Sequence, residues 1–341
     1  MRVVVKTLST VGVFVGLIES SPINGTAGYA FILIFLFIGI AVVVSAVIDG
    51  LYAVCRRKIE IYDSSHVMLN IASQLSTWNN MGLWTHTAEF VPAAIALATK
   101  LSDAVQLQLS DDLLDIGIGC GDQAKVYAPL SKSYVGITSL AAQADMARSA
   151  LASADCANNA KIWTLDASDP ATWPEEILLS VGSPNKIIAL DCLYHFSPSR
   201  ARFLAFAHDI LERTHDTKKC HVAFAAEDLL RGPNLSRIHS LALNVICKLS
   251  HSPAVNFVTQ HDYATLLHNA GFTPDSGWTV TFEHVSDSVF PGLCEFIARR
   301  SSDKGVGKYL TFSKYTTFGK LVSWWHANDI IRAYVITLTK Q

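Results

Sequence analysis

The sequence predicts an α/β domain with a doubly wound sheet, preceded by an N-terminal helix that spans a membrane. Three observations support this fold class. An apolar, strand-like run leads into a glycine-rich loop at 113–122. Three more short apolar runs that end in polar residues follow at 134–138, 161–169 and 186–191, and residues 20–48 carry no charge. Short buried strands that alternate with helical segments are typical of a parallel sheet covered on both faces.

The uncharged stretch near the N-terminus is long enough to cross a bilayer. It spans 29 residues, 20–48, and a transmembrane helix needs about 20. A cleaved signal peptide does not fit, because its apolar region is only roughly 7 to 15 residues long. A core helix does not fit either, since a helix that is apolar on all sides has nowhere to be buried against a separate domain. We therefore expect a membrane segment at 1–54 with a transmembrane helix at about 27–49.

The charges that flank this helix predict its orientation. Arg56, Arg57 and Lys58 follow it directly, and the positive-inside rule places such a cluster in the cytosol, although Arg2 and Lys6 oppose this weakly. We expect a single-pass protein whose main domain faces the cytosol, at the endoplasmic reticulum or another internal membrane. The seven cysteines are scattered without metal-ligand spacing, so neither a disulfide nor a bound metal is expected.

The overall composition argues against one class of partner. The 341 residues include 27 basic and 29 acidic ones, and no basic run is interleaved with aromatic side chains, which argues against nucleic-acid binding. A hydrophobic fraction of 50% and a charged fraction of 16% are unusual for a soluble domain and agree with a membrane helix.

The glycine-rich loop has the spacing of a turn that brings backbone close to a ligand. Gly117, Gly119 and Gly121 lie two residues apart behind Asp115, and glycine permits the positive φ and close approach that a Cβ would block. A dinucleotide-binding loop reads G-x-G-x-x-G. Here the third glycine comes one residue early and Asp122 stands in its place, so a nicotinamide cofactor is disfavoured.

The pattern Asp-x-Gly-x-Gly-x-Gly that begins at Asp115 resembles the first motif of the class I S-adenosylmethionine-dependent methyltransferases. The later strand ends fall in register with that family. The resemblance covers roughly residues 75–341 and is strongest at 111–200. It implies a Rossmann-like sheet of seven strands, S-adenosyl-L-methionine as cofactor, a methyltransferase domain at 111–341, and a linker with a helical cap at 55–110.

The resemblance also implies which residues bind the cofactor. The family usually has an acid after the second strand to bind the ribose hydroxyls, but this chain has a threonine there. The stretch 136–143 instead resembles the variant found in tocopherol, sterol and cyclopropane-type lipid methyltransferases, with Ser and Leu exchanged in order. The implied cofactor residues are Asp115, Gly117, Gly119, Gly121, Ile137, Thr138, Asp166, Ala167 and Asp191.

The rest of the chain is predicted from its periodicity. Residues 89–101 have helical apolar spacing. Residues 78–84 carry two tryptophans and resemble an element that precedes the core in small-molecule methyltransferases, where it acts either as a lid or as a packing anchor. Further helices are expected at 199–214, 235–250 and 260–269, and further strands at 221–226, 278–284 and 332–338.

One titratable side chain lies where the resemblance places the reacting centre. His195, beside Tyr194, follows the fourth strand, and an imidazole titrates near neutral pH, as a general base requires. The alternative is that His195 only shapes its loop. The sequence from Asp191 to Tyr194 lacks the Pro-Pro of enzymes that methylate nucleobases or glutamine amides, which disfavours DNA and protein amides as acceptors.

These observations lead to one favoured function and two alternatives. The favoured function is a membrane-anchored methyltransferase whose acceptor is a small amphiphilic or lipid-like molecule. The first alternative adds a methyl or methylene group to a lipid alkene, although cyclopropane-type enzymes usually carry a Glu-His pair where this chain has Tyr194 and His195. The second is a catalytically silent membrane adaptor with the methyltransferase fold, which the intact glycine loop disfavours.

Overall fold

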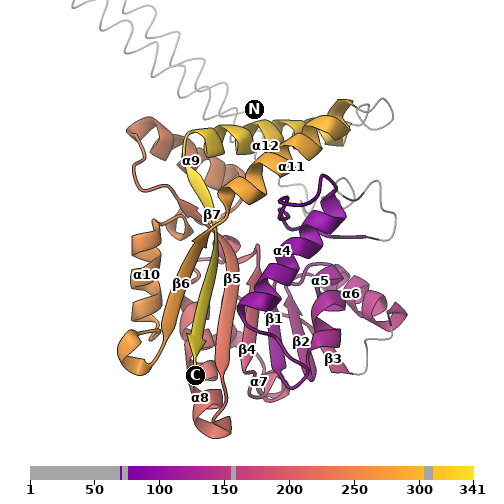
Figure 1. Ribbon diagram of the computed structural model, residues 1–341, viewed down its shortest axis with the longest axis vertical. Helices are drawn as coiled ribbons and strands as arrows, with labels where there is room; N and C mark the ends of the chain where they lie inside the picture. Colours follow the sequence, from indigo (N-terminus) through magenta and orange to yellow (C-terminus); the bar gives the residue numbers. More distant parts are fainter. Residues whose placement is uncertain (1–69, 71–75, 155–158, 303–309) are drawn as a thin grey trace, which may run out of the picture. The chain divides into compact units, whose positions relative to one another are not determined.

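The computed structural model describes residues 70, 76–154, 159–302 and 310–341. Within these residues, a seven-stranded sheet runs in the order β3-β2-β1-β4-β5-β7-β6 (Figure 1). The first five strands pair in parallel, and β7 pairs antiparallel with both β5 and β6. The strands are β1 (Asp112–Ile116), β2 (Ser133–Thr138), β3 (Ala160–Thr164), β4 (Lys186–Leu190), β5 (Val222–Arg231), β6 (Thr279–His284) and β7 (Ile331–Lys340).

Helices cover both faces of the sheet, which confirms the predicted doubly wound class (Figure 1). One set packs its apolar side chains into one buried cluster, and a second set packs into another cluster on the opposite face. The first set is α4 (Phe90–Ala104), α5 (Asp122–Tyr127) and α6 (Ala141–Ser153), and the second set is α7 (Glu175–Val181), α8 (Ala201–Lys218) and α10 (Gln260–Asn269).

Three more helices lie at the edge of the sheet where the parallel strands end (Figure 1). α9 (Arg237–Leu249) follows β5, α11 (Ser286–Ser302) follows β6, and α12 (Leu310–Ala327) precedes the antiparallel β7. Their buried side chains join the same apolar cluster as α4, α5 and α6. These three helices form a cap over this edge that is separate from the helical cap expected at residues 55–110, which stays a prediction.

The winding of the sheet reverses between β1 and β4. The chain runs from β1 outward to β2 and β3, and then returns to place β4 on the other side of β1, where Ile116 pairs with Ala189. In open α/β sheets, ligands bind beyond the carboxyl ends of the strands at such a reversal. The glycine loop after β1 and the turn after β4 meet at this point.

The structure adds to the predicted elements more than it corrects them. β5 continues to Arg231, beyond the predicted end at residue 226, because its whole length pairs with β7, from Val222 with Lys340 to Arg231 with Ile331. The sequence reasoning missed α7, α11 and α12; α11 has Pro291 inside it, a residue that usually marks a helix boundary.

The predicted transmembrane helix at 27–49, and with it the membrane segment at 1–54, lies outside the described residues. A search of the described helices finds none with both the length and the apolar character that crossing a bilayer requires.

Candidate active site

The three glycines after β1 form a turn that is crowded on one side and open on the other. All three have positive φ, 74° at Gly117, 53° at Gly119 and 92° at Gly121. A Cβ on Gly117 would lie 2.6 Å from the Cβ of Cys192, and one on Gly121 would lie 2.5 Å from the Cβ of Ala147. A Cβ on Gly119 would meet nothing within 4 Å. The outer side of the turn therefore leaves space for a ligand to approach the backbone.

Asp115 lies on β1, just before this turn. Its side chain is fully buried, and its two oxygens accept hydrogen bonds from Gln123 Nε2 at 2.8 Å and from the Tyr134 hydroxyl at 2.6 Å. Burial raises the pKa of the Asp115 carboxyl to about 7, against the opposing effect of these hydrogen bonds. Asp115 thus links β1 to α5 and β2 beside the glycine turn, and its predicted role in binding the cofactor stays a prediction.

The end of β2 supports the loop through its backbone and presents a polar pair. The Ile137 carbonyl accepts hydrogen bonds from the amides of Gly117 and Ile118 at 2.9 and 3.0 Å, while its side chain is buried in the core. The Thr138 hydroxyl donates to Gln143 Oε1 at 2.8 Å. Gln143 lies in the first turn of α6, so this pair stands at the carboxyl end of β2.

The end of β3 lies next along this edge. Asp166 is exposed, and its Oδ1 accepts hydrogen bonds from the amide and hydroxyl of Ser168 at 2.8 and 2.6 Å. Ala167 is buried against the apolar cluster that includes Trp173. The structure brings these two predicted residues to the same edge as the glycine loop, and their contact with the cofactor stays a prediction.

Residues 77–84, called the cap segment below, are fastened to the ends of β1 and β4. The Thr77 hydroxyl donates to Asp122 Oδ2 at 2.8 Å, and the Thr77 amide donates to the same oxygen. The Met81 amide donates to Asp191 Oδ2 at 2.9 Å, and Trp84 Nε1 donates to the Met81 carbonyl at 2.8 Å. The segment therefore covers the point where the sheet reverses, and its tryptophans are buried in the core.

Asp191 orders the turn after β4. It has a positive φ of 53°, and its Oδ1 accepts a hydrogen bond from the Tyr194 hydroxyl at 2.7 Å. Burial raises the pKa of the Asp191 carboxyl to about 7. Of the two roles expected for Asp191, ordering of the loop and contact with the cofactor, the structure shows the contacts of the first.

His195 follows in the same turn, in the short 3-10 helix Leu193–His195. Its Nδ1 lies 2.9 Å from the Ser252 hydroxyl, and its ring centroid lies 4.2 Å from that of Tyr194. Burial lowers the pKa of His195 to about 4. The imidazole is therefore neutral at physiological pH and is a weaker base than a histidine in water.

A buried polar network beneath this turn was not predicted. Asn256, which is 1% exposed, donates from Nδ2 to the carbonyls of Tyr194 and Phe196 at 3.1 and 2.8 Å. Arg200 forms a fully buried ion pair with Asp228 and also donates to the Asn256 carbonyl. These contacts join α8 and β5 to the turn, so they hold Tyr194 and His195 in place.

A second buried acid, Glu227, precedes Asp228 on β5 and was also missed. Its side chain is fully buried, and neither carboxyl oxygen has a hydrogen-bond partner among the described residues. Burial, followed by the charges of Asp191 and Asp228, holds the pKa of Glu227 well above its ordinary value. Two successive acids within the apolar run of β5 were the signal in the sequence that could have found this pair.

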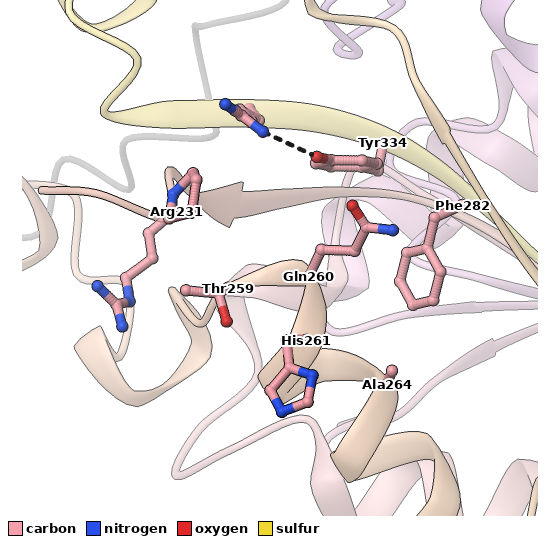
Figure 2. Close-up of a pocket in the computed structure, with 9 residues that line it drawn as sticks. Arg231, Thr259, Gln260, His261, Ala264, Phe282 and Tyr334 are labelled. Atoms are coloured by element: carbon pink, nitrogen blue, oxygen red, sulfur yellow. Dashed lines mark hydrogen bonds between the residues drawn. The ribbon is translucent and has the colours of Figure 1, made fainter.

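A surface cavity of about 640 Å³ lies elsewhere, beside the start of α10 (Figure 2). Two of its cations already have acidic partners: Arg332 donates to Asp329 at 2.5 and 2.6 Å, and Arg231 lies 3.9 Å from Asp262. None of the predicted site residues lines it. The lining residues are Arg231, Pro233, Thr259, Gln260, His261, Ala264, Phe282, Arg332 and Tyr334.

Comparisons with known proteins give similarity in structure but not in sequence. No family model and no curated protein matches the chain. Among solved structures, one described as a sarcosine dimethylglycine methyltransferase from Galdieria sulphuraria has a TM-score of 0.62 and 14% identity over 82% of this chain and 98% of that one. The mycolic acid cyclopropane synthase CmaA1, complexed with S-adenosylhomocysteine (SAH) and CTAB, has a TM-score of 0.61 and 14% identity over 82% and 95%. The cyclase SpnF has a TM-score of 0.57 and 17% identity over 82% and 94%.

Proposed function

We propose, from the premise that the chain has the fold of class I S-adenosylmethionine-dependent methyltransferases, that it transfers a methyl group from S-adenosyl-L-methionine to a small amphiphilic or lipid-like acceptor at a membrane. The fold itself is common to the neighbours compared above. The observation that carries the proposal is the glycine turn, which is open at Gly119 and lies where the sheet reverses.

The residues at this edge fit the cofactor. A cradle that a side chain would fill exists at Gly119, and the polar groups of Thr138 with Gln143 and of Asp166 lie at the next two strand ends, where the ribose and adenine are expected. When bound, the cofactor supplies a methyl group that is already activated on a sulfonium. Little covalent chemistry then remains for the protein, whose tasks are to align donor and acceptor and to exclude water.

The side chains near the turn after β4 suit that limited role. His195 is neutral and has a pKa of about 4, so it is not a strong base. Tyr194 and the tryptophans of the cap segment belong to one buried apolar cluster beside this turn, and we expect an acceptor that reaches this side to be desolvated. These properties favour an acceptor whose attacking atom needs no strong base, such as an amine or an alkene.

SpnF, which has a similar fold, is named as a cyclase, so the fold alone does not establish methyl transfer. Binding and transfer therefore need separate tests. We would titrate the full-length chain, in lipid nanodiscs, with SAH by calorimetry, and then incubate it with methyl-labelled cofactor and lipid extracts. Gly119→Arg is expected to abolish binding, while Gly119→Ala, the control, is expected to retain most of it.

The outcomes separate the proposals. Saturable binding with label appearing in a lipid-soluble product supports the methyltransferase, and a cyclopropane in that product would identify transfer to an alkene. Binding without any labelled product would favour a non-transferring role. Absence of binding to the wild-type chain would refute the proposal.

Membrane attachment is part of the proposal and has two supports. The first is the uncharged run at residues 20–48, with the basic cluster after it that assigns the main domain to the cytosolic side of an internal membrane. The second is the outer face of α9. On α9, Ile238 is 77% exposed, Leu241 is 66% exposed and Val245 is also exposed. Trp324 of α12 is exposed beside them.

The charges of this face agree with a membrane surface. α9 contains no acid, and Arg237 and Lys248 stand at its two ends. An exposed apolar stripe flanked by basic residues is typical of a helix that lies in the bilayer interface. It belongs to the same edge of the sheet as the glycine loop, so an acceptor held in the bilayer would have a short path to the site.

A photoactivatable phospholipid tests this orientation. In liposomes that contain the full-length chain, crosslinks are expected at residues 238–245 as well as at 20–48. Leu179 on α7, which is 74% exposed, is the matched control and should stay unlabelled. Labelling at 20–48 alone would refute the contact of α9 with the membrane.

A further inference from the structure

Glu227 occupies a central place at the edge of the sheet that carries the site. It is the last residue of β5 that pairs with β4, where it lies in register with Leu190, the last residue of β4. Its carbonyl accepts a hydrogen bond from the amide of Asp191 at 3.2 Å. The residue is therefore directly beside the turn that contains Tyr194 and His195.

The alternation of side chains along β5 places Glu227 on the face of the cap. Ala223, Ala225 and Leu229, which have the same parity, belong to the cluster that contains the tryptophans of the cap segment and the buried residues of α9 and α11. Asp228 points the other way, where it contacts Arg200 and Tyr263. The Glu227 carboxyl thus faces the side on which an acceptor would lie.

On that side the carboxyl group has no partner. Both of its oxygens are buried without a hydrogen bond among the described residues, and its side chain is fully buried. The buried arginine next to it in the fold, Arg200, is already paired with Asp228 on the opposite face. An unpaired buried polar group destabilises a protein, and one that is kept in a core therefore needs an explanation.

We propose that Glu227 binds the methyl acceptor directly, and that the group it binds is a cationic nitrogen of the acceptor other than the atom that receives the methyl group. This inference rests on the proposed function. Glu227 and Asp191 are two neighbouring acids on the acceptor side, and a positive charge placed between them would interact favourably with both. A neutral hydroxyl carries no charge and would lack this attraction.

A pair of small probes tests the proposal. N,N-dimethylcyclohexylamine is protonated at neutral pH, and cyclohexanol is its neutral counterpart. Each is titrated into the full-length chain in nanodiscs, with and without saturating SAH. Glu227→Gln keeps the shape and removes the charge, and Glu176→Gln, on the exposed start of α7, is the matched control.

The expected result is selective. Loss of a charge-assisted hydrogen bond should weaken binding of the amine by about 10- to 100-fold in Glu227→Gln, with the affinities for SAH and cyclohexanol unchanged. Glu176→Gln should behave as wild type. Because burial holds the pKa of Glu227 well above its ordinary value, binding of the amine should release a proton from the wild-type chain, detected by calorimetry in two buffers of different ionisation enthalpy, and Glu227→Gln should not release one.

Three results would overturn the proposal. The amine could bind Glu227→Gln as well as it binds wild type, it could bind neither protein, or the variant could lose affinity for SAH, which would make Glu227 a cofactor group. Failure of the wild-type chain to bind SAH would instead refute the proposed function, and the amine titrations without SAH would still report on Glu227.

Discussion

Replacing Glu227 by methionine is expected to stabilise the unliganded protein while it removes binding of the amine. Methionine has a similar length and no polar atom that needs a hydrogen bond. A buried group left without a partner costs roughly 1–3 kcal/mol, and the core around Glu227 is apolar and fully buried. For a domain of this size, each 1 kcal/mol corresponds to a rise in Tm of about 2–4 °C.

The stabilisation expected for Glu227→Met should also depend on pH, and it should increase as the pH rises. Glu227 keeps its proton in the folded state well above its ordinary pKa, whereas the unfolded chain releases it near pH 4.3. Above that pH the folded state binds more protons than the unfolded state, so Glu227 lowers the stability of the wild type by about 1.4 kcal/mol per pH unit until its folded pKa is reached. Methionine removes this slope.

Thermal unfolding of the full-length chain in nanodiscs, followed by tryptophan fluorescence between pH 4 and 7, measures both effects. The difference in Tm between Glu227→Met and wild type should be positive at pH 4 and should grow as the pH rises. A difference that is negative at every pH would show that Glu227 makes stabilising contacts in the unliganded protein, and the reasoning above would be wrong.

Three other predictions test separate parts of the site. Gly119→Arg and Gly119→Ala both place a side chain at positive φ and should cost a similar amount of stability, about 1 kcal/mol, but only the arginine fills the open space and should weaken SAH binding by more than about tenfold, as calorimetry would report. Arg200→Met leaves the buried carboxylate of Asp228 without its ion-pair partner, so it should destabilise the protein by about 3–5 kcal/mol in urea unfolding. Adding Asp228→Leu should recover much of this loss. If stability does not recover, the ion pair is not the cause of the loss. His195 has a pKa of about 4 in the folded state and about 6.5 in the unfolded state. Between these values the unfolded state binds more protons, so the stability of the wild type should fall as the pH is lowered through this window. His195→Gln should lack this pH dependence, and identical pH profiles for the two proteins would contradict the burial of this imidazole.

The features that could be predicted from the sequence depend on the spacing of residues that are close together in the chain. The glycine loop, the strands before Thr138 and Asp191, and the helix at 260–269 all follow from residues within one strand or one turn of each other. The register of β1 with β2 and β4 then brings the ends together without any further information. The side chains of Asp115 and Ile137 are buried, and their contact with the cofactor stays a prediction.

The features that the sequence did not predict depend on contacts between distant residues. Thr77 and Asp122 are 45 positions apart, and Met81 and Asp191 are 110 apart. No local pattern pairs them. The sequence shows two neighbouring acids in β5, but it does not show their contacts. In the fold, Asp228 forms an ion pair with Arg200 on one face of the sheet, while the Glu227 carboxyl faces the cap without a hydrogen-bond partner among the described residues.

The fastening of the cap segment has a consequence for the order in which molecules enter. Thr77 ties the segment to Asp122, the first residue of α5 directly after the glycine loop, and Met81 ties it to Asp191 in the turn on the acceptor side. Because both ties lie on one short segment, we expect that release of one would loosen the other. We therefore expect compulsory-order kinetics, in which the donor enters while both ties are open and the acceptor site takes its final shape only after they close.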